Sequence, residues 1–576
     1  MTRLSAFRPP EARRRNGKDA APAFAALTAA ALLAAASPAA WAFELETDNP
    51  DLKMRLDTTV KYSNAFRLKS ASPALISDPS TNPNSSLYFP NMDDGDRNFN
   101  RGLISNRLDL LGEFDLSYKD FGGRVSVAAW GDSVYHRGTA NTSPQTSNSV
   151  PYNRFTSATS QLHGGDAEVL DAFVFGKTDL GSMPLSVKLG RFNQLYGESF
   201  MMGFNGMAAA AGAVDVIKAA SVPNSLFKEF MRPTPQISGQ LQINSDVTVG
   251  GYYMLGWEPD RLPATGSYFS NVDFLGTGAT RLIVGSSPLG NVGFYRQADM
   301  EAKSSGQGGA QIKWHVGEVD YGLYAARWNE HGPQLYLHPY TTIAPLANIN
   351  GLGLQVGTYQ WVYHEGVKAV GGSFSTTVGN VNLAGEASVR YNASLDSDAQ
   401  VDLTGRGNNS DNPLYAVGKT AHAQLSWIAA LGPSFLSREA DFVGELAWNR
   451  VLSVTKNLSA LNPNATRDAA NVRTVFEPKY RQVLPGLDFS VPVGLGWGLM
   501  GNSAAVGAFL GKDTGDLSIG LNGTYLGVWN FALNYTHYLG KAGTFLIADA
   551  SGNYHRSFLQ SNADRDFISF NVRRTF

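Results

Sequence analysis

The side chains best placed for chemistry in this sequence belong to one segment, residues 197–235, which reads GESFMMGFNGMAAAAGAVDVIKAASVPNSLFKEFMRPTP. The charges of this segment, together with one residue that precedes it, carry both signs: Arg191, Glu198, Asp215, Lys218, Lys228, Glu229 and Arg232. Fixed charges of one sign at the narrow section of a pore select solutes by charge. Because both signs occur here, a constriction formed by this set is not expected to be strongly ion-selective.

Motifs for catalysis are a second kind of chemistry, and the familiar ones are not found in the sequence. No serine lies in a Gly-x-Ser-x-Gly elbow, and the His-Glu-Gly that begins at His364 lacks the second histidine of a zinc helix. A surface hydrolase assembled from His422, His537 and Ser426 on distant strands is the third and least favoured interpretation. We therefore predict that the protein is not an enzyme.

Acidic residues lie close together in DDGD, residues 93–96. Asp93, Asp94 and Asp96 could offer hard oxygen ligands to calcium. The spacing is not that of an EF-hand, however, and Asp-Gly is ordinary turn chemistry. We expect a turn here, and no metal or other cofactor.

Most of the remaining chain alternates between apolar and polar residues, which is typical of β-strands with two different faces. The stretch that begins at Leu103, LISNRLDLLGEFDLSY, is one of many examples, and short turns alternate with long polar connections along the chain. Short turns at one end and long loops at the other are typical of a transmembrane β-barrel, which pairs every backbone polar group internally. The pattern predicts an all-β fold: an antiparallel barrel of roughly 16–18 strands over residues 43–576, with long outer loops.

Charged residues on the polar faces of these strands are expected to line the lumen. They include Arg55, Lys61, Arg107, Asp109, Glu113 and Arg390. Ladders of mixed sign would hold one another in a wet interior, each exposed pair contributing about 0–1 kcal/mol. A substrate path along these charges is the alternative.

The last ten residues, FISFNVRRTF, form a period-two strand with Phe570, Val572 and Phe576 on one face. We expect this strand to close the barrel by pairing with the strand that begins near Lys53. A terminal strand that ends in an aromatic residue also resembles the C-terminal signal that the outer-membrane assembly machinery reads in porins.

The segment at residues 197–235 breaks the strand pattern. The stretch from Met207 to Ala220 is alanine-rich and lacks alternation, which predicts a helix, and Ser221 is a candidate N-cap for a second one. A barrel wall cannot contain such a piece. We expect this helical insert to fold into the lumen as a plug or constriction; an ordered outer loop with no gating role is the alternative.

The first residues of the chain predict export. Positive charges, an alanine-rich apolar run and the sequence Ala40-Trp41-Ala42 form a secretory signal peptide over residues 1–42, with cleavage before Phe43. The 576 residues include 60 glycines and no cysteine, 17% are charged, and the net charge is −2. No disulfide framework can form, and the acidic balance argues against a nucleic-acid partner. The predicted location is the bacterial outer membrane.

Several segments resemble a family of proteobacterial outer-membrane proteins that is grouped only as a domain of unknown function and is porin-like. They include DDGDRNFNRGLISNRLDLLGEFD from Asp93, PLSVKLGRFNQLYGES from Pro184 and RDFISFNVRRTF at the end. Family members usually have Trp-Gly-Glu-Ser where this chain has Tyr196-Gly197-Glu198-Ser199. The resemblance implies an exported barrel, often suspected of transport and sometimes encoded near systems that export or degrade hydrophobic compounds.

Together these patterns predict an outer-membrane channel or transporter for small solutes, hydrophobic ones among them, through a partly occluded barrel. The alternative is a non-transporting envelope protein that is structural or binds a partner. Expected partners are outer-membrane lipid, the assembly machinery, and an envelope lipoprotein or export system. The solute, the direction of transport and the oligomeric state do not follow from the sequence.

Overall fold

The computed structural model describes residues 43–45, 47–77, 90–340 and 353–576. The predicted signal peptide, residues 1–42, and its cleavage site lie outside these ranges. Within them, no helix is long and apolar enough to cross a membrane. The dominant element of the described chain is one large β-sheet, as the alternating sequence predicts.

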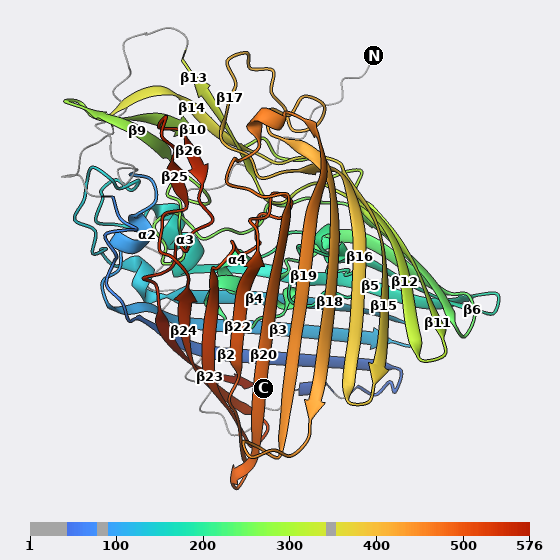
Figure 1. The fold of residues 1–576 in the computed structure, drawn as a ribbon. Helices are drawn as coiled ribbons and strands as arrows, with labels where there is room; N and C mark the ends of the chain where they lie inside the picture. The colour runs from blue at the N-terminus through green and yellow to red at the C-terminus, as the bar shows by residue number, and fades with distance from the viewer. Residues whose placement is uncertain (1–42, 46, 78–89, 341–352) are drawn as a thin grey trace, which may run out of the picture. The chain divides into compact units, whose positions relative to one another are not determined.

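This sheet is a closed antiparallel barrel of 18 strands, within the predicted range (Figure 1). β21 and β22 lie end to end at one position of the wall, because both pair with β20 and with β23. A short additional strand, β1 (Phe43–Leu45), pairs with β2. In chain order the wall consists of β2 (Leu52–Arg67), β3 (Gly102–Tyr118), β4 (Phe121–Asp132), β5 (Gly165–Leu180), β6 (Met183–Phe192), β7 (Thr234–Gln242), β8 (Val247–Met254), β11 (Gly308–Val316), β12 (Val319–Trp328), β15 (Val367–Val378), β16 (Val381–Ser394), β18 (Val417–Leu431), β19 (Glu439–Lys456), β20 (Asp468–Leu484), β21 (Leu487–Ser490), β22 (Val493–Met500), β23 (Gly515–Tyr525), β24 (Trp529–Leu539) and β27 (Phe567–Thr575).

The barrel closes between its first and last wall strands. β27 pairs with β24 on one side and with β2 on the other, in a register that runs from Thr59 opposite Thr575 to Arg67 opposite Phe567. The backbone N–H and C=O of Thr58 add two hydrogen bonds to Phe576. The predicted partner of the terminal strand is therefore confirmed.

The wall has an apolar outer face and a polar inner face. In β19, Glu445 and Asn449 are buried, whereas Leu446 and Leu452 are exposed. Successive side chains of a strand point to opposite faces, so these leucines lie on the outside of the barrel. Exposed apolar residues of other strands continue this surface, among them Val127, Val174, Ile237, Ile312, Val370, Leu425, Ile519 and Leu533. An apolar belt around a polar interior is the arrangement that lipid requires of a spanning barrel.

Short and long connections lie at opposite ends of the wall strands. Residues 119–120, 181–182, 317–318 and 379–380 are two-residue turns, whereas residues 68–101, 133–164 and 255–307 are long connections. The long connections contain α2 (Asp94–Arg97), η1 (Ser133–His136), α3 (Ser157–Gly164) and η3 (Leu458–Ala460). This confirms the predicted long loops at one end.

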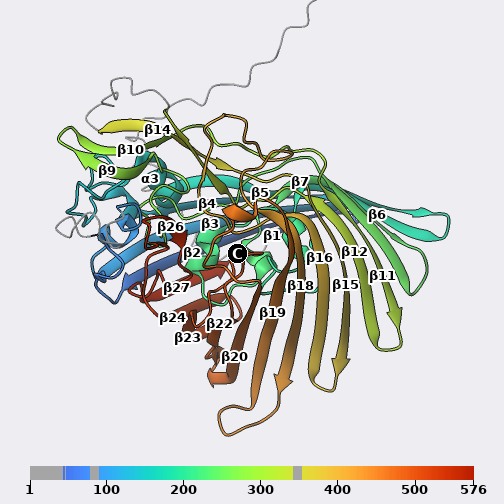
Figure 2. The ribbon, with the colours of Figure 1, turned by 45° about the horizontal axis from the view of Figure 1, so that its top comes forward.

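The long connections also build a second sheet, which the sequence analysis did not predict. It contains β9 (Arg281–Ser287), β10 (Gly290–Arg296), β14 (Leu354–Val362), β13 (Gln334–Pro339) and β17 (Gln400–Val401), paired in that order, and β25 (Leu546–Ala548) with β26 (Tyr554–Arg556) forms a separate hairpin. Figures 1 and 2 place these strands beyond the ends of the wall strands, on the side of the long connections. Tyr359 and Trp361 of β14 pack with Phe274 of a long connection in one buried aromatic cluster.

Candidate functional site

The insert between β6 and β7 spans residues 193–233 and contains three short helical pieces: η2 (Met207–Ala211), α4 (Val216–Ser221) and α5 (Phe227–Phe230). The prediction of one helix from Met207 to Ala220 is wrong. Gly212 has a φ of 136°, outside the helical region, and ends η2. The predicted bounds of the insert, residues 197–235, become residues 193–233, because β6 ends at Phe192 and β7 begins at Thr234.

The caps of the insert helices also differ from prediction. Asp215 is the N-cap of α4, where its carboxylate accepts a hydrogen bond from the Lys218 backbone N–H at 3.0 Å. Ser221 is the last residue of α4 and not the N-cap of the next helix. α5 begins after Leu226, whose backbone N–H donates to the Glu229 carboxylate at 2.9 Å. The sequence predicted helical structure in this stretch, but the number of helices, their bounds and their caps differ from the prediction.

The insert has a small apolar core of its own. Ala208, Ala211 and Val214 pack against Phe227 and Phe230, and all five are buried. Because aromatic side chains bury a large area, such a cluster can stabilise a short non-repetitive segment. The insert is therefore a folded unit.

Two wall carboxylates hold the beginning of the insert. Glu445 of β19 accepts hydrogen bonds from the Ser199 hydroxyl at 2.6 Å and from the backbone N–H groups of Phe200 and Met201 at 3.0 and 2.7 Å. Glu386 of β16 accepts from the backbone N–H groups of Glu198, at 2.7 Å, and of Met207. Both carboxylates are buried and lie on the inner face of the wall.

Other inner-face residues contact the insert from distant strands. Arg390 of β16 donates to the carbonyl oxygens of Phe204 and Gly206 at 2.9 and 2.8 Å. Three further contacts come from elsewhere on the wall: Tyr252 of β8 to the Ala210 carbonyl, Lys313 of β11 to Glu198, and Ser518 of β23 to Asn224. In Figures 1 and 2 the green insert lies between the orange strands in front and the blue strands behind. The insert thus reaches across the interior of the barrel.

The charges predicted for the constriction fall into two ion-pair groups and some separate positions. Arg191 and Arg232 share Glu258, at 2.8 and 2.7 Å. Asp215 pairs with Arg261 at 3.0 Å, and Arg261 also binds Glu168. Sequence reasoning missed Glu258 and Arg261, which follow β8 in the stretch WEPDR.

The remaining predicted charges lie apart from these groups. Glu198 pairs with Lys313 at 3.0 Å. Lys218 donates to the Glu229 carbonyl at 2.5 Å, and Lys228 is exposed. The predicted set therefore does not form a single ring of charge.

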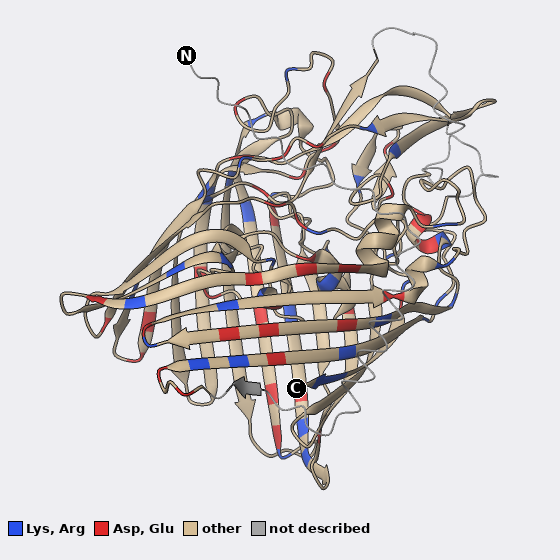
Figure 3. Ribbon diagram, turned by 180° about the vertical axis from the view of Figure 1, so that it is seen from behind, with Lys and Arg blue, Asp and Glu red and all other residues tan. Residues whose placement is uncertain are grey.

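Residues of both charge signs are interspersed along neighbouring wall strands (Figure 3). Several of the charges predicted for the lumen wall form ion pairs of opposite sign. Arg55 pairs with Asp57 at 2.8 Å and Arg107 pairs with Asp109 at 2.7 Å. Arg124 bridges Glu113 and Asp115, at 3.9 and 2.6 Å. Lys61 lies opposite Asp109 in the register of β2 and β3. The sign alternates along the wall, so these ladders alone favour neither cations nor anions.

A large cavity is lined by the insert and by the second sheet. It has a volume of about 1330 Å³, and insert residues including Phe204, Ala209 and Phe227 line one side of it. Leu282 of β9 and Leu337 of β13, both in the second sheet, also line it. A separate cavity of about 270 Å³ is lined by wall residues such as Lys177 and Ser186, close to a short turn, and by Gln194 and Tyr196 of the insert. The two cavities share no lining residue in the described chain.

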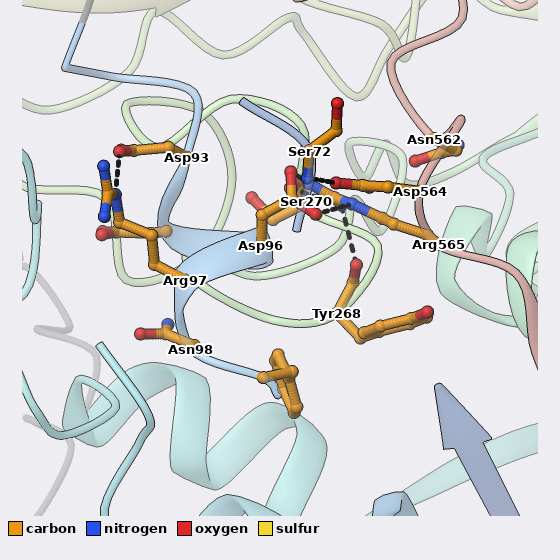
Figure 4. A network of polar contacts seen from close by, with 12 residues as sticks. Ser72, Asp93, Asp96, Arg97, Asn98, Tyr268, Ser270, Asn562, Asp564 and Arg565 are labelled. Carbon is orange, nitrogen blue, oxygen red and sulfur yellow. Dashed lines mark hydrogen bonds and ion pairs between the residues drawn. The ribbon is translucent and has the colours of Figure 1, made fainter. Parts of the chain in front are cut away.

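The DDGD residues form a helical turn, α2, and not the simple turn predicted from Asp-Gly. Asp96 accepts hydrogen bonds from two buried guanidinium groups. Arg565 donates from both Nε and Nη2 at 3.0 Å (Figure 4), and Arg67 donates at 2.9 Å. Arg67 ends β2, and Arg565 precedes β27. This buried network ties the outer ends of the two closing strands together.

Asp93 and Asp94 lie beside Asp273, with one carboxylate oxygen from each within 4.8 Å of the others. Burial, followed by the negative charge of Asp94, raises the pKa of Asp93 to about 7, and burial raises the pKa of Asp94 to about 6. Burial also raises the pKa of Asp273 well above its ordinary value. Asp93 additionally binds the Arg97 guanidinium at 2.5 Å, so an arginine side chain already contacts this carboxylate.

The residues considered for a hydrolase form hydrogen bonds with other groups. His422 bonds to the Thr420 hydroxyl and the Asn205 amide, and the Ser426 hydroxyl donates to the Ala384 carbonyl. His537 bonds to the Asp566 carboxylate at 2.6 Å. No catalytic arrangement of these three residues is present in the described chain.

Together, the closed wall, the apolar outer face and the folded insert define a porin-like β-barrel. The chain belongs to the family described as protein of unknown function (DUF1302), whose model matches residues 23–576. The family resemblance expected from the sequence is confirmed.

Comparison with characterised proteins adds little beyond the family. No curated protein matches the chain. Among solved structures, OccAB2 of Acinetobacter baumannii matches with 9% identity and a TM-score of 0.40, over 91% of this chain and 98% of that one. Pseudomonas aeruginosa OpdK with vanillate matches with 10% identity and a TM-score of 0.36, over 90% and 98%. Salmonella typhi OmpF in complex with daunomycin matches with 8% identity and a TM-score of 0.34, over 93% and 100%. Likenesses of this size do not indicate a substrate.

Proposed function

We propose that the protein is an outer-membrane channel or transporter for small solutes, hydrophobic ones among them, and that its insert partly occludes the lumen. The apolar belt of the wall supports a location in lipid, and the closed hydrogen-bonding of β2 with β27 leaves no strand edge exposed there. Its partners in this proposal are outer-membrane lipid, the assembly machinery, and an envelope lipoprotein or export system. It has no enzymatic role.

The contact between the insert and the inner wall carries this proposal. Five hydrogen bonds join Glu386 and Glu445 to the start of the insert, and further contacts come from β8, β11 and β23. A loop that only decorated the outside of the barrel would not bond to inner-face residues of so many strands. In this position the insert narrows any path between the two ends of the barrel.

Single-channel conductance in a planar bilayer tests the proposal. Deleting residues 206–221 removes η2 and α4 and is expected to raise conductance, because part of the obstruction is lost. The matched control deletes residues 403–406, an exposed loop segment outside the insert, and is expected to leave conductance unchanged. Heat-modifiable migration confirms folding of each variant. Unchanged conductance in a correctly folded insert deletion would refute an occluding role.

A further inference from the structure

We propose that the large cavity lined by the insert and the second sheet binds a neutral, largely apolar small molecule and discriminates against anionic amphiphiles such as fatty acids. This inference rests on the proposed function, because it names the class of solute that the barrel would admit. The size of the cavity, the character of its walls and the contacts of its cationic residues support the proposal.

The cavity is large enough for a substantial organic molecule. Its volume of about 1330 Å³ exceeds the roughly 300–1,000 Å³ that is usual for small-molecule sites. Because insert residues line part of the cavity, a molecule in the cavity would contact the element that we propose to occlude the lumen. Occupation of the cavity and movement of the insert would therefore affect each other.

The walls of the cavity present mainly hydrocarbon. Phe274 and Trp361 stack with their ring centroids 5.8 Å apart, and Leu282 and Leu337 pack in the same cluster. The Trp361 indole N–H donates to the Phe274 carbonyl at 3.2 Å, so this polar atom is already used within the protein. A ligand that meets these side chains gains burial of its own apolar surface, about 25 cal/mol for each Å².

The cationic residues that line the cavity are already engaged. Arg556 pairs with Asp396 at 2.9 Å, and His555 pairs with Asp398 at 2.8 Å. The buried Arg390 donates to two insert carbonyl oxygens and lies 5.5 Å from the centre of the Trp328 ring.

The other titratable lining residues add no positive charge. Burial lowers the pKa of His331 to about 4, so this side chain is neutral at pH 7. Asp260 and Glu330 bring further carboxyl groups to the lining. An anionic ligand would lose its water shell here without gaining a free cation, which is unfavourable. A neutral ligand avoids this cost.

Two probes with the same aromatic skeleton test the inference. N-phenyl-1-naphthylamine is neutral, and 8-anilino-1-naphthalenesulfonate carries a sulfonate on that skeleton. We expect the detergent-solubilised full chain to bind the neutral probe saturably, and at least roughly tenfold more tightly than the anionic probe, because a buried unpaired charge is costly. Equal or tighter binding of the anionic probe would overturn the inference.

Substitutions locate the binding. Leu337→Glu places a charge on the cavity wall and should weaken the neutral probe roughly tenfold. Val284→Glu tests the same wall at a residue that is 50% exposed and so tolerates a charge, and it should weaken binding in the same direction. The control is Leu289→Glu, in the turn after Val284, which is 60% exposed and does not line the cavity. An equal loss in the control, or no loss in either wall variant, would overturn the assignment.

The binding and conductance experiments separate the two proposals. If the neutral probe binds saturably but deletion of the insert leaves conductance unchanged, the ligand site is supported and the occluding role of the insert is rejected. If deletion of the insert raises conductance but the full chain binds the anionic probe more tightly, the channel is supported and the preference for a neutral ligand is rejected.

Discussion

At the scale of single residues, the structure separates charges that stabilise the fold from charges that only line a wet surface. Asp96, Arg67 and Arg565 are almost completely buried, and both guanidinium groups bind the Asp96 carboxylate. Asp109 and Arg107 form a pair of similar length, but each side chain is 29% exposed. Burial makes the difference, because a charge that loses its partner inside the protein keeps its desolvation cost.

Removing the Asp96 carboxylate is therefore expected to be costly. Asp96→Asn leaves two buried guanidinium groups without their shared anion and should lower the free energy of unfolding by about 3–5 kcal/mol. Asp109→Asn, the control at the exposed pair, should cost about 1 kcal/mol or less. Urea unfolding in lipid vesicles measures both. Equal losses in the two variants would mean that burial of the network does not matter.

Buried loop carboxyls predict a dependence of stability on pH. The pKa values of Asp93 and Asp94 are raised to about 7 and about 6, above the roughly 3.9 of an unfolded chain. Between these values the folded chain keeps protons that the unfolded chain releases, so their contribution is present at low pH and lost as the pH rises through about 7. We expect hydrogen exchange around α2, corrected for its intrinsic rate, to become faster from about pH 5 to about pH 8.

A substitution within the cluster provides the control for this pH dependence. Burial is the main cause of the raised pKa of Asp93, and the charge of Asp94 is the second. Asp94→Asn removes that charge and also one of the two titrating carboxyl groups, so it should flatten the profile. A corrected exchange rate that falls between the two pH values in the unsubstituted chain would contradict the prediction.

At the scale of elements, the insert combines its own apolar core with polar attachment to the wall. The core of Ala208, Phe227 and Phe230 maintains its shape, while Glu386 and Glu445 determine its position. Hydrogen bonds to charged groups contribute about 1.5–3 kcal/mol each, which exceeds typical neutral ones. Weakening the attachment should thus release the insert without unfolding it.

The double substitution Glu386→Gln with Glu445→Gln tests this separation. Loss of both charges should leave a folded barrel that shows larger or more frequent openings in single-channel recordings. Glu477→Gln is the matched control, because Glu477 of β20 accepts a hydrogen bond from Ser490 of the wall and none from the insert. If the double variant and the control conduct alike, the two carboxylates do not hold the insert in place.

At the scale of the whole molecule, closure joins parts of the chain that are far apart in sequence. β2 and β27 form one continuous ladder, and the Asp96 network fastens their outer ends. Near the other end, Phe576 is buried and lies under the Arg574 guanidinium at 4.4 Å from the ring centre. Phe570, in contrast, is exposed on the outer face.

The role of Phe576 as an assembly signal is a prediction. Phe576→Ala should reduce the yield of heat-modifiable barrel in cells several-fold, while refolding of the purified chain in detergent should be little affected. Thr575→Ala at the adjacent position is the control and should assemble normally. A similar defect in cells and in detergent would point to lost stability and not to recognition.

The alternation of single strands determined the class of fold in advance. A period of two fixes which residues share a face of a strand, so Arg107 and Asp109 could be assigned to the lumen before any contact was known. The range of roughly 16–18 strands and the pairing of the terminal strand followed from the same pattern, whereas the number of 18 came from the structure. The helical character of the insert followed from its alanine-rich composition, but the break at Gly212 depends on a backbone angle that composition does not specify.

Only the tertiary structure decided where these elements meet. Glu386 and Glu445 lie in strands that alternate like the other wall strands, and nothing near them in the sequence indicates that they bind the insert. Glu258, Arg261 and the apolar cavity likewise depend on loops from separate connections. The physical reason is range: side-chain periodicity is a local property that each strand carries alone, whereas a site in the lumen arises from contacts between distant segments that only the closed barrel brings together.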